Sequence, residues 1–303
     1  MRFQGFRVSK FRGFNIFVPT HLRLMSTLAA LRLAIFLFPF SFFQTACFEP
    51  KEGCLDIEAT NFDAAADDDC CCLYPKLRLE TVQRFDTFQY LPDSLYPADN
   101  GSLFRIKSVV FYLSEFQLTQ NGETFVVSDT VQLQAFSQSG SDTIKEIFTD
   151  DFLLARRTPV DNEVGDFRPA GVFQNVKIRL GLSPDAQRVI PRLAKSGHPL
   201  RIQGDSLWYG RDAGFVFLQA VVVRDSMAAT PPDTLAFTKA DFDNFFIEQT
   251  GVFTHQSGGY DFRLRLGVDY KKMFEGINWT TGDILTWKSQ IVANLPNVFR
   301  VSQ

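Results

Sequence analysis

Histidine and tryptophan are scarce in this chain, with three of each among 303 residues. The short motifs of several common enzyme classes are absent: we find no Gly-x-Ser-x-Gly nucleophile elbow, no P-loop and no His-Glu-x-x-His zinc motif. The net charge is only −3, so the sequence lacks the basic character that marks nucleic-acid binding. These absences predict a protein that is not an enzyme and has no nucleic-acid partner.

Long hydrophobic runs are also lacking, and the longest is too short to span a bilayer. It covers residues 33–43 and follows a short segment with one basic residue that begins at Met25, which predicts an export signal and a translation start at Met25. The small residues 45–46 before Cys47 resemble a lipobox, the site where a bacterial lipoprotein is cleaved and lipidated. Plain secretion and an uncleaved anchor are the alternatives. We therefore predict an exported protein, anchored to the outer membrane through lipid on Cys47 and facing the periplasm or the cell surface.

This interpretation divides the chain into three parts. Residues 1–46 are the signal peptide, residues 47–75 are a lipid-anchored acidic module, and residues 76–303 are the main domain. About 257 residues remain after the signal peptide, which is ample for a substantial core.

Cysteines occur only near the start of the exported part. Besides Cys47 there are four, an even number that favours two disulfides in an exported protein. Adjacent cysteines rarely pair, so we expect Cys54 to bond to a member of the triplet; a zinc cluster is the alternative. The four residues are Cys54, Cys70, Cys71 and Cys72.

Hard oxygen ligands crowd the stretch between these cysteines. Six such side chains within fourteen residues suit Ca²⁺, although a solvated loop held by a disulfide explains them equally well. They are Asp56, Asn61, Asp63, Asp67, Asp68 and Asp69. The stretch 53–75 resembles a short repeat of exported bacterial proteins, Gly-Cys-x-Asp-x-x-Ala-x-Asn-Tyr-Asp-x-x-Ala followed by acidic residues and cysteine.

From residue 76 the pattern is that of strands. Alternating apolar and polar residues, together with an Asn-Gly turn at 121–122, predict an antiparallel β-sandwich with a few short helices. The expected strands are residues 77–83, 104–118, 124–133, 173–180, 214–223 and 260–268. The expected helices are residues 183–195, 270–274 and 284–294. Residues 142–169 and 242–246 are expected to be loops.

The order of these segments resembles the MbnP-like family, exported copper-binding proteins associated with methanobactin. The resemblance rests on residues 109–118, 176–185, 207–215 and 255–261, and it implies a β-sandwich. In that family histidines hold copper, and a tryptophan is oxidised to kynurenine with help from a di-haem peroxidase-like partner.

The resemblance implies copper binding at His255 and a modified aromatic at Trp208. The opening strand, where the family carries another histidine, has none here, and Trp208 is one position out of register with the family tryptophan. The alternative is therefore a non-enzymatic binding or structural lipoprotein that has lost the metal site. Aromatic residues and arginines in the expected loops, notably Phe148, Phe152, Arg156, Arg157, Phe167 and 242–246, suit an interface.

Overall fold

The computed structural model describes residues 49–140, 142–201, 207–225, 227 and 229–303. The predicted signal peptide, Met25 and Cys47 lie outside these residues. Lys51–Gln303 forms one compact unit. In this described part of the chain, no helix is both long enough and apolar enough to cross a membrane.

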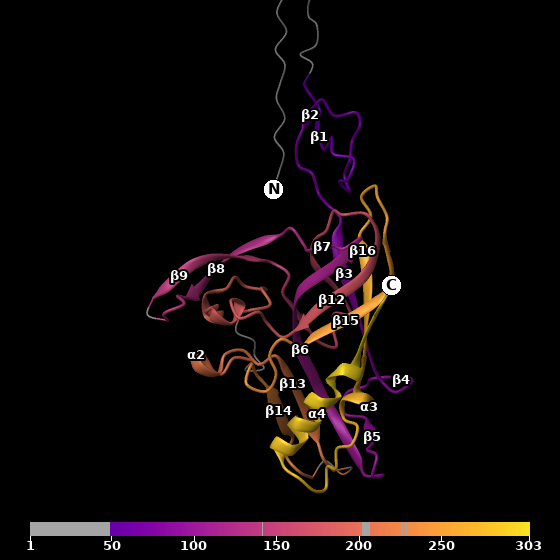
Figure 1. Ribbon diagram of the computed structural model, residues 1–303, viewed down its shortest axis with the longest axis vertical. Coiled ribbons are helices and arrows are strands. Elements are labelled where there is room, and N and C mark those ends of the chain that lie inside the picture. The colour runs from indigo at the N-terminus through magenta and orange to yellow at the C-terminus, as the bar shows by residue number, and fades with distance from the viewer. Residues whose placement is uncertain (1–48, 141, 202–206, 226, 228) are drawn as a thin grey trace, which may run out of the picture. The chain divides into compact units, whose positions relative to one another are not determined.

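The main domain is a β-sandwich, as predicted from the alternating pattern (Figure 1). Its larger sheet has the order β14-β13-β6-β12-β15, with β5, β7 and β10 also paired to the long strand β6. The strands are β5 (Leu95–Pro97), β6 (Leu103–Gln120), β7 (Glu123–Phe125), β10 (Leu153–Ala155), β12 (Gly171–Leu180), β13 (Leu218–Val223), β14 (Asp233–Phe237) and β15 (Phe246–His255).

The second sheet has the order β11-β3-β16-β17, and β4 pairs with the end of β3. Its strands are β3 (Lys76–Phe85), β4 (Phe88–Gln89), β11 (Asp161–Asp166), β16 (Phe262–Asp269) and β17 (Phe299–Ser302). The pairing of β3 with β16 is parallel, in register from Leu77 opposite Phe262 to Arg84 opposite Asp269. This parallel pair is an exception within the predicted antiparallel sandwich, and it is possible because the two strands are far apart in sequence and are joined by no local turn.

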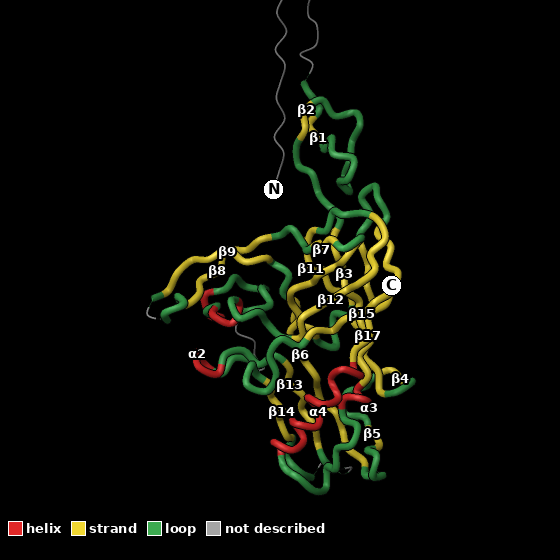
Figure 2. Tube along the Cα trace, in the orientation of Figure 1, coloured by secondary structure: helices red, strands yellow, loops and turns green. Residues whose placement is uncertain are grey.

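The remaining elements are short (Figure 2). Strands β8 (Thr130–Phe136) and β9 (Thr143–Thr149) form a separate two-stranded ribbon. The helices are η2 (Ala186–Arg188), η3 (Pro191–Leu193), α2 (Gly210–Ala213), α3 (Tyr270–Met273) and α4 (Ile284–Val298). The helices expected at 270–274 and 284–294 are thus confirmed.

Aromatic side chains fill the space between the sheets. Strand β3 buries alternate residues, a set that begins with Leu77 and Leu79 and ends with Phe85, whereas β13 and the middle of β6 are buried on both faces. Near α3 and α4 the core includes Trp279 and Trp287, which are 1% and 4% exposed. Burial of such large rings is the main favourable contribution to the fold.

Two regions differ from the expectation. The segment 142–169 was predicted as a loop, but it contains β9, β10 and β11. Its phenylalanines at 148, 152 and 167, and Phe242 in the second expected loop, are buried, so they serve the core and not an interface. The helix predicted at 183–195 is two 3₁₀ turns, and Pro191, which has no N–H to donate, begins the second of them.

A bulge in β6 is held by a buried carboxylate. The pairing of β6 with β12 shifts register between Ser114 and Gln117, and Glu115 there has φ 51°. The amide N–H of Phe116 donates to Oδ2 of Asp151 at 3.0 Å. Asp151 is only 4% exposed, and burial is the main cause that raises its pKa to about 6.

The acidic module contains two two-residue strands, β1 (Glu52–Gly53) and β2 (Asp68–Asp69), which pair in parallel. A disulfide joins Cys54 to Cys72, as expected. The structure also joins Cys70 to Cys71, so the expectation that adjacent cysteines avoid each other is wrong. Once Cys54 has bonded to Cys72, the two adjacent sulfurs are the pair left.

The module contacts the turn between β15 and β16 at Gly259. A Cβ atom added to Gly259 would lie 2.7 Å from the carbonyl oxygen of Ala59 and 2.8 Å from Cα of Thr60. Beside this contact the Arg168 guanidinium lies 3.2 Å from the centroid of the Tyr74 ring. The module is therefore packed against the main domain by backbone that tolerates no side chain.

We expect Gly259→Ala to loosen the module, with Gly258→Ala as the matched control. Both glycines have positive φ, +82° and +87°, so alanine strains the turn at either position, but at Gly258 the nearest atom to an added Cβ is 4.0 Å away. The backbone strain costs roughly 1 kcal/mol in both variants, and the clash adds about 1–3 kcal/mol in Gly259→Ala alone. Hydrogen exchange of the module amides measures the difference. Equal exchange in the two variants would show that the contact contributes nothing.

Candidate functional site

The predicted copper ligand His255 is engaged at both ring nitrogens. Nδ1 lies 2.7 Å from the carbonyl oxygen of Pro169, and Nε2 lies 2.7 Å from that of Tyr260. A carbonyl oxygen lies in front of each ring nitrogen at hydrogen-bond distance, so it occupies the position that a metal bound to that nitrogen would need. The ring is 3% exposed and stacks on Phe262 at 5.1 Å. The residue does not fit copper as it stands; it holds the turn between β15 and β16.

His198, which has no counterpart in the family pattern, and Trp208, the aromatic residue that the resemblance implies, are also built into the fold. At His198, Nε2 lies 3.2 Å from Oδ1 of Asp150, and Nδ1 accepts from the amide N–H of Leu200 at 3.1 Å. Trp208 is half-buried against the core, and its backbone pairs with Phe215. Oxidation of Trp208 stays a prediction, since packing alone explains the position of its ring.

Most of the predicted calcium ligands hold the backbone of the module. Asp56 accepts a hydrogen bond from the amide of Glu58 and another from the Tyr74 hydroxyl. Three further carboxylates each accept from a backbone amide: Asp63 from Ala65, Asp67 from Lys51 and Asp69 from Leu55. Asn61 bridges Cys71 and Leu73. Asp63 also pairs with Lys51 at 2.6 Å, a contact that keeps the pKa of Asp63 low. Calcium binding finds no support in this arrangement.

One group of three possible metal ligands occurs among the described residues. The ligand atoms of Cys54, Asp69 and Cys72 lie within 4.8 Å of one another. Both sulfurs are bonded to each other, however, and a disulfide offers no thiolate to a metal. The disulfide therefore explains why these ligand atoms lie close together.

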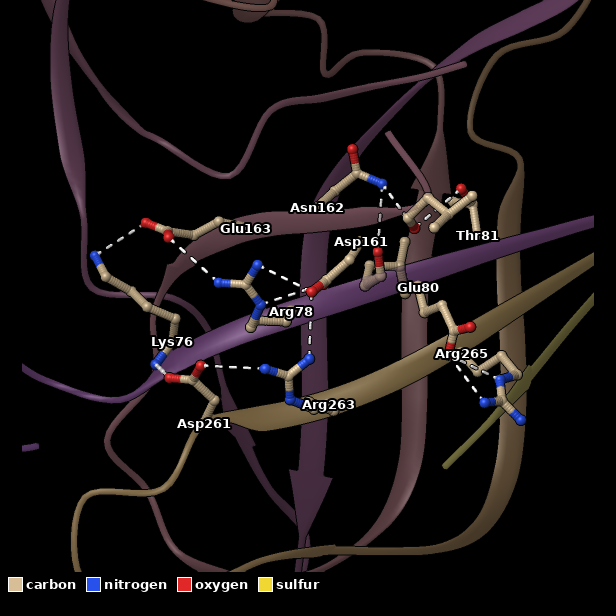
Figure 3. Close-up of polar contacts among 12 residues, drawn as sticks. Lys76, Arg78, Glu80, Thr81, Asp161, Asn162, Glu163, Asp261, Arg263 and Arg265 are labelled. Atoms are coloured by element: carbon tan, nitrogen blue, oxygen red, sulfur yellow. Dashed lines mark hydrogen bonds and ion pairs between the residues drawn. The ribbon is translucent and has the colours of Figure 1, made fainter. Parts of the chain in front are cut away.

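Charged side chains gather instead on the outer face of the second sheet (Figure 3). Alternate residues of β3 and β16 point away from the core, and parallel register places Arg78 beside Arg263 and Glu80 beside Arg265. A cavity of about 600 Å³, here called the charged groove, crosses this face. It is lined by Arg78, Glu80, Val160, Asp161, Thr254, Gln256, Tyr260, Asp261, Arg263, Leu264, Arg265 and Gln303.

Carboxylates connect the arginines of the groove across the strands. Asp161 on β11 accepts from Nε and Nη2 of Arg78 at 3.1 and 3.0 Å, and from Nη1 of Arg263 at 3.3 Å. The hydrogen bond from Arg78 is the main cause that lowers the pKa of Asp161. Without this carboxylate two guanidinium groups would lie side by side, which is unfavourable. Each exposed pair adds little stability, but together they fix the directions of the side chains.

A second cavity of about 510 Å³, here called the arginine cleft, continues from the groove. The two share Glu80 and Val160. The cleft runs along β3 to β4 and is lined by Glu80, Thr81, Val82, Gln83, Arg84, Thr87, Gln89, Tyr90, Arg157, Thr158 and Val160. The two cavities are therefore neighbours over the second sheet.

The sequence gives a partial signal for this surface. The charged residues at every second position of β3 and β16 are visible in the alternating segments 77–83 and 260–268. What sequence reasoning missed is that β16 lies beside β3 and that Asp161 belongs to a strand of the same sheet. Long-range pairing of this kind has no local signature.

Comparisons with known proteins add little to this description. No family model matches the chain, and no curated protein matches it. Among solved structures, the chain is similar to MbnP from Methylosinus trichosporium, with 12% sequence identity and a TM-score of 0.38, over 67% of this chain and 78% of that chain. A likeness this remote does not establish membership of the family and says nothing about a ligand. The function has to be argued from the site.

Proposed function

We propose that this chain is an exported, lipid-anchored protein of the bacterial cell envelope that binds a ligand in the charged groove and catalyses no reaction. The observation that carries the binding role is the groove itself. Ion pairs across β11, β3 and β16 orient three arginines and three carboxylates around one cavity of about 600 Å³. A cavity of this size, lined by convergent polar groups, is typical of a binding site.

Export and anchoring are supported by two features of the chain. The short apolar run before Cys47 has the form of a lipoprotein signal, and disulfides form in oxidising compartments outside the cytoplasm. Copper and a di-haem partner are not part of this proposal, because both ring nitrogens of His255 are engaged.

Retention by cell-envelope material tests the proposal. The full chain, purified in detergent, is mixed with envelope fractions of its host that have been freed of membrane lipid, and the fraction that sediments is measured. We expect Arg263→Ala to sediment roughly tenfold less than the wild type, because the loss of charge-assisted bonds weakens binding by about that factor. Arg192→Ala is the matched control, since Arg192 is exposed and lies outside the groove.

Equal sedimentation of the two variants would end the proposed binding role. Radioactive palmitate added to cells tests the anchor separately: the wild type should be labelled and Cys47→Ser should not. Label on both proteins would refute lipidation at Cys47.

A further inference from the structure

The groove offers paired hydrogen-bond donors and acceptors without net charge. Arg265 donates from Nε and Nη2 to Oε2 of Glu80, at 3.0 and 2.9 Å. In the described part of the chain, Nη1 of Arg265 and Oε1 of Glu80 have no partner, and both side chains are about half exposed, at 55% and 42%. An exposed guanidinium N–H and an exposed carboxylate oxygen on the same pair suit hydroxyl groups, which can accept from the first or donate to the second.

An exposed aromatic ring stands at the far end of the same groove. Tyr260 is 62% exposed, while its carbonyl oxygen is fixed by His255. An exposed ring presents a flat apolar face next to polar groups, which suits a ligand with both C–H and O–H surfaces. A sugar ring has this character.

The arginine cleft differs from the groove in charge. Arg84 and Arg157 both line it and are exposed, and among the described residues neither forms an ion pair. Glu80, the carboxylate that lines this cleft, is already engaged by Arg265. The cleft therefore has an unbalanced positive charge, which favours an anionic group on the ligand.

From these two surfaces we infer that the ligand is a glycan chain that carries carboxylate groups, as a polymer containing uronic acid does. This inference rests on the proposed binding function and names its ligand class. Sugar hydroxyls bind along the charged groove, and a sugar carboxylate binds Arg84 and Arg157 in the arginine cleft. The volumes of the two cavities, about 600 and 510 Å³, leave room for more than one sugar unit.

Other polymers fit this surface less well. A nucleic acid carries a phosphate at every unit and would meet the three carboxylates that line the groove. A peptide could not add as a strand along β3, because β11 and β16 already occupy the two sides of that strand. A hydroxyl-rich chain with spaced carboxylates matches both the charged groove, which has no net charge, and the arginine cleft, which is positive.

Oligogalacturonate and its methyl ester provide the test, because esterification removes the negative charge of each carboxylate and adds only a methyl group. With the full chain in detergent, calorimetric titration should give an affinity for oligogalacturonate roughly tenfold or more above that for the ester. The double variant Arg84→Ala/Arg157→Ala should bind the two ligands equally. Arg265→Ala should weaken both, and Arg192→Ala should behave as the wild type.

The outcomes separate this inference from the proposed function. If oligogalacturonate does not bind, or if the wild type binds the ester equally well, the glycan inference is wrong, while a loss of envelope retention in Arg263→Ala would still support binding in the groove. If Arg84→Ala/Arg157→Ala keeps the preference for the carboxylate, the assignment of the arginine cleft is wrong. Circular dichroism of each variant confirms that it is folded.

Discussion

Trp279→Ala should destabilise the main domain by about 3–5 kcal/mol, the cost typical of removing a large aromatic ring from a core. The ring is 1% exposed and contacts three others, with centroids 5.0 Å from Phe104, 5.7 Å from Phe274 and 5.3 Å from Trp287. Because these rings come from β6, from the residue after α3 and from α4, the cavity would weaken several elements together. Urea unfolding measures the change, and the melting temperature should fall by roughly 6–20 °C.

Trp208→Ala is the matched control. Trp208 is half-buried at the edge of the core, so its loss should cost clearly less than that of Trp279. Trp279→Phe should recover much of the stability, because it restores a ring and removes an indole N–H that has no partner in the structure. If Trp208→Ala costs as much as Trp279→Ala, the core is not centred where the structure places it.

Asp151→Asn should make stability less dependent on pH. Burial raises the pKa of Asp151 to about 6, whereas a carboxyl in the unfolded chain titrates near 3.9. Between these values the folded protein holds a proton that the unfolded chain has released. The stability that this group contributes is therefore complete below about pH 4 and is lost as pH rises through 6. Between pH 4 and pH 7 the wild type should lose up to about 3 kcal/mol relative to Asp151→Asn.

Urea unfolding at a series of pH values measures this difference. The asparagine keeps an oxygen that can accept from the amide of Phe116, so the bulge of β6 should remain. Asp212→Asn, which removes an exposed carboxylate from α2, is the control for the loss of one charge. If the free energy of unfolding changes equally with pH in the wild type and in Asp151→Asn, the pKa of Asp151 is not raised in the folded state.

Local patterns predicted much of the strand content, because strands such as β3 and β16 bury one face. The Asn-Gly turn is a clear case: Asn121 and Gly122 both have positive φ, and they join β6 to β7 as expected. The segment 124–133, however, is two strands in different sheets, since residues 126–129 leave the larger sheet before β8 begins. Alternation alone does not show where a strand changes its partner.

The capping residue at the start of the segment 183–195 was predicted correctly, but the length of the helix that follows it was not. Ser183 does accept from the amide of Ala186, as its place before Pro184 suggests, yet the helix ends after three residues. Val189 and Ile190 are buried in an irregular segment, and Ile190 donates its amide to Gln134 on β8. Tertiary contacts outweighed helix propensity there.

The candidate site was the least predictable part. Composition drew attention to histidines, cysteines and acidic residues, because these are the usual ligands of metals. The structure uses His255 to hold a turn and Asp56 to hold a loop. The surface residues that do converge, such as Arg265 and Glu80, are 185 positions apart and look like ordinary charged faces of separate strands. Only the register of β3 and β16 brings them together.

The parallel pair also has a consequence for how the chain is made. Strand β3 opens the main domain, but its long partner β16 begins at residue 262, so a growing chain exposes one side of β3 until nearly all of the domain has been synthesised. Contacts between residues so distant in sequence close slowly. The second sheet, and with it the charged groove, can therefore form only in a finished polypeptide.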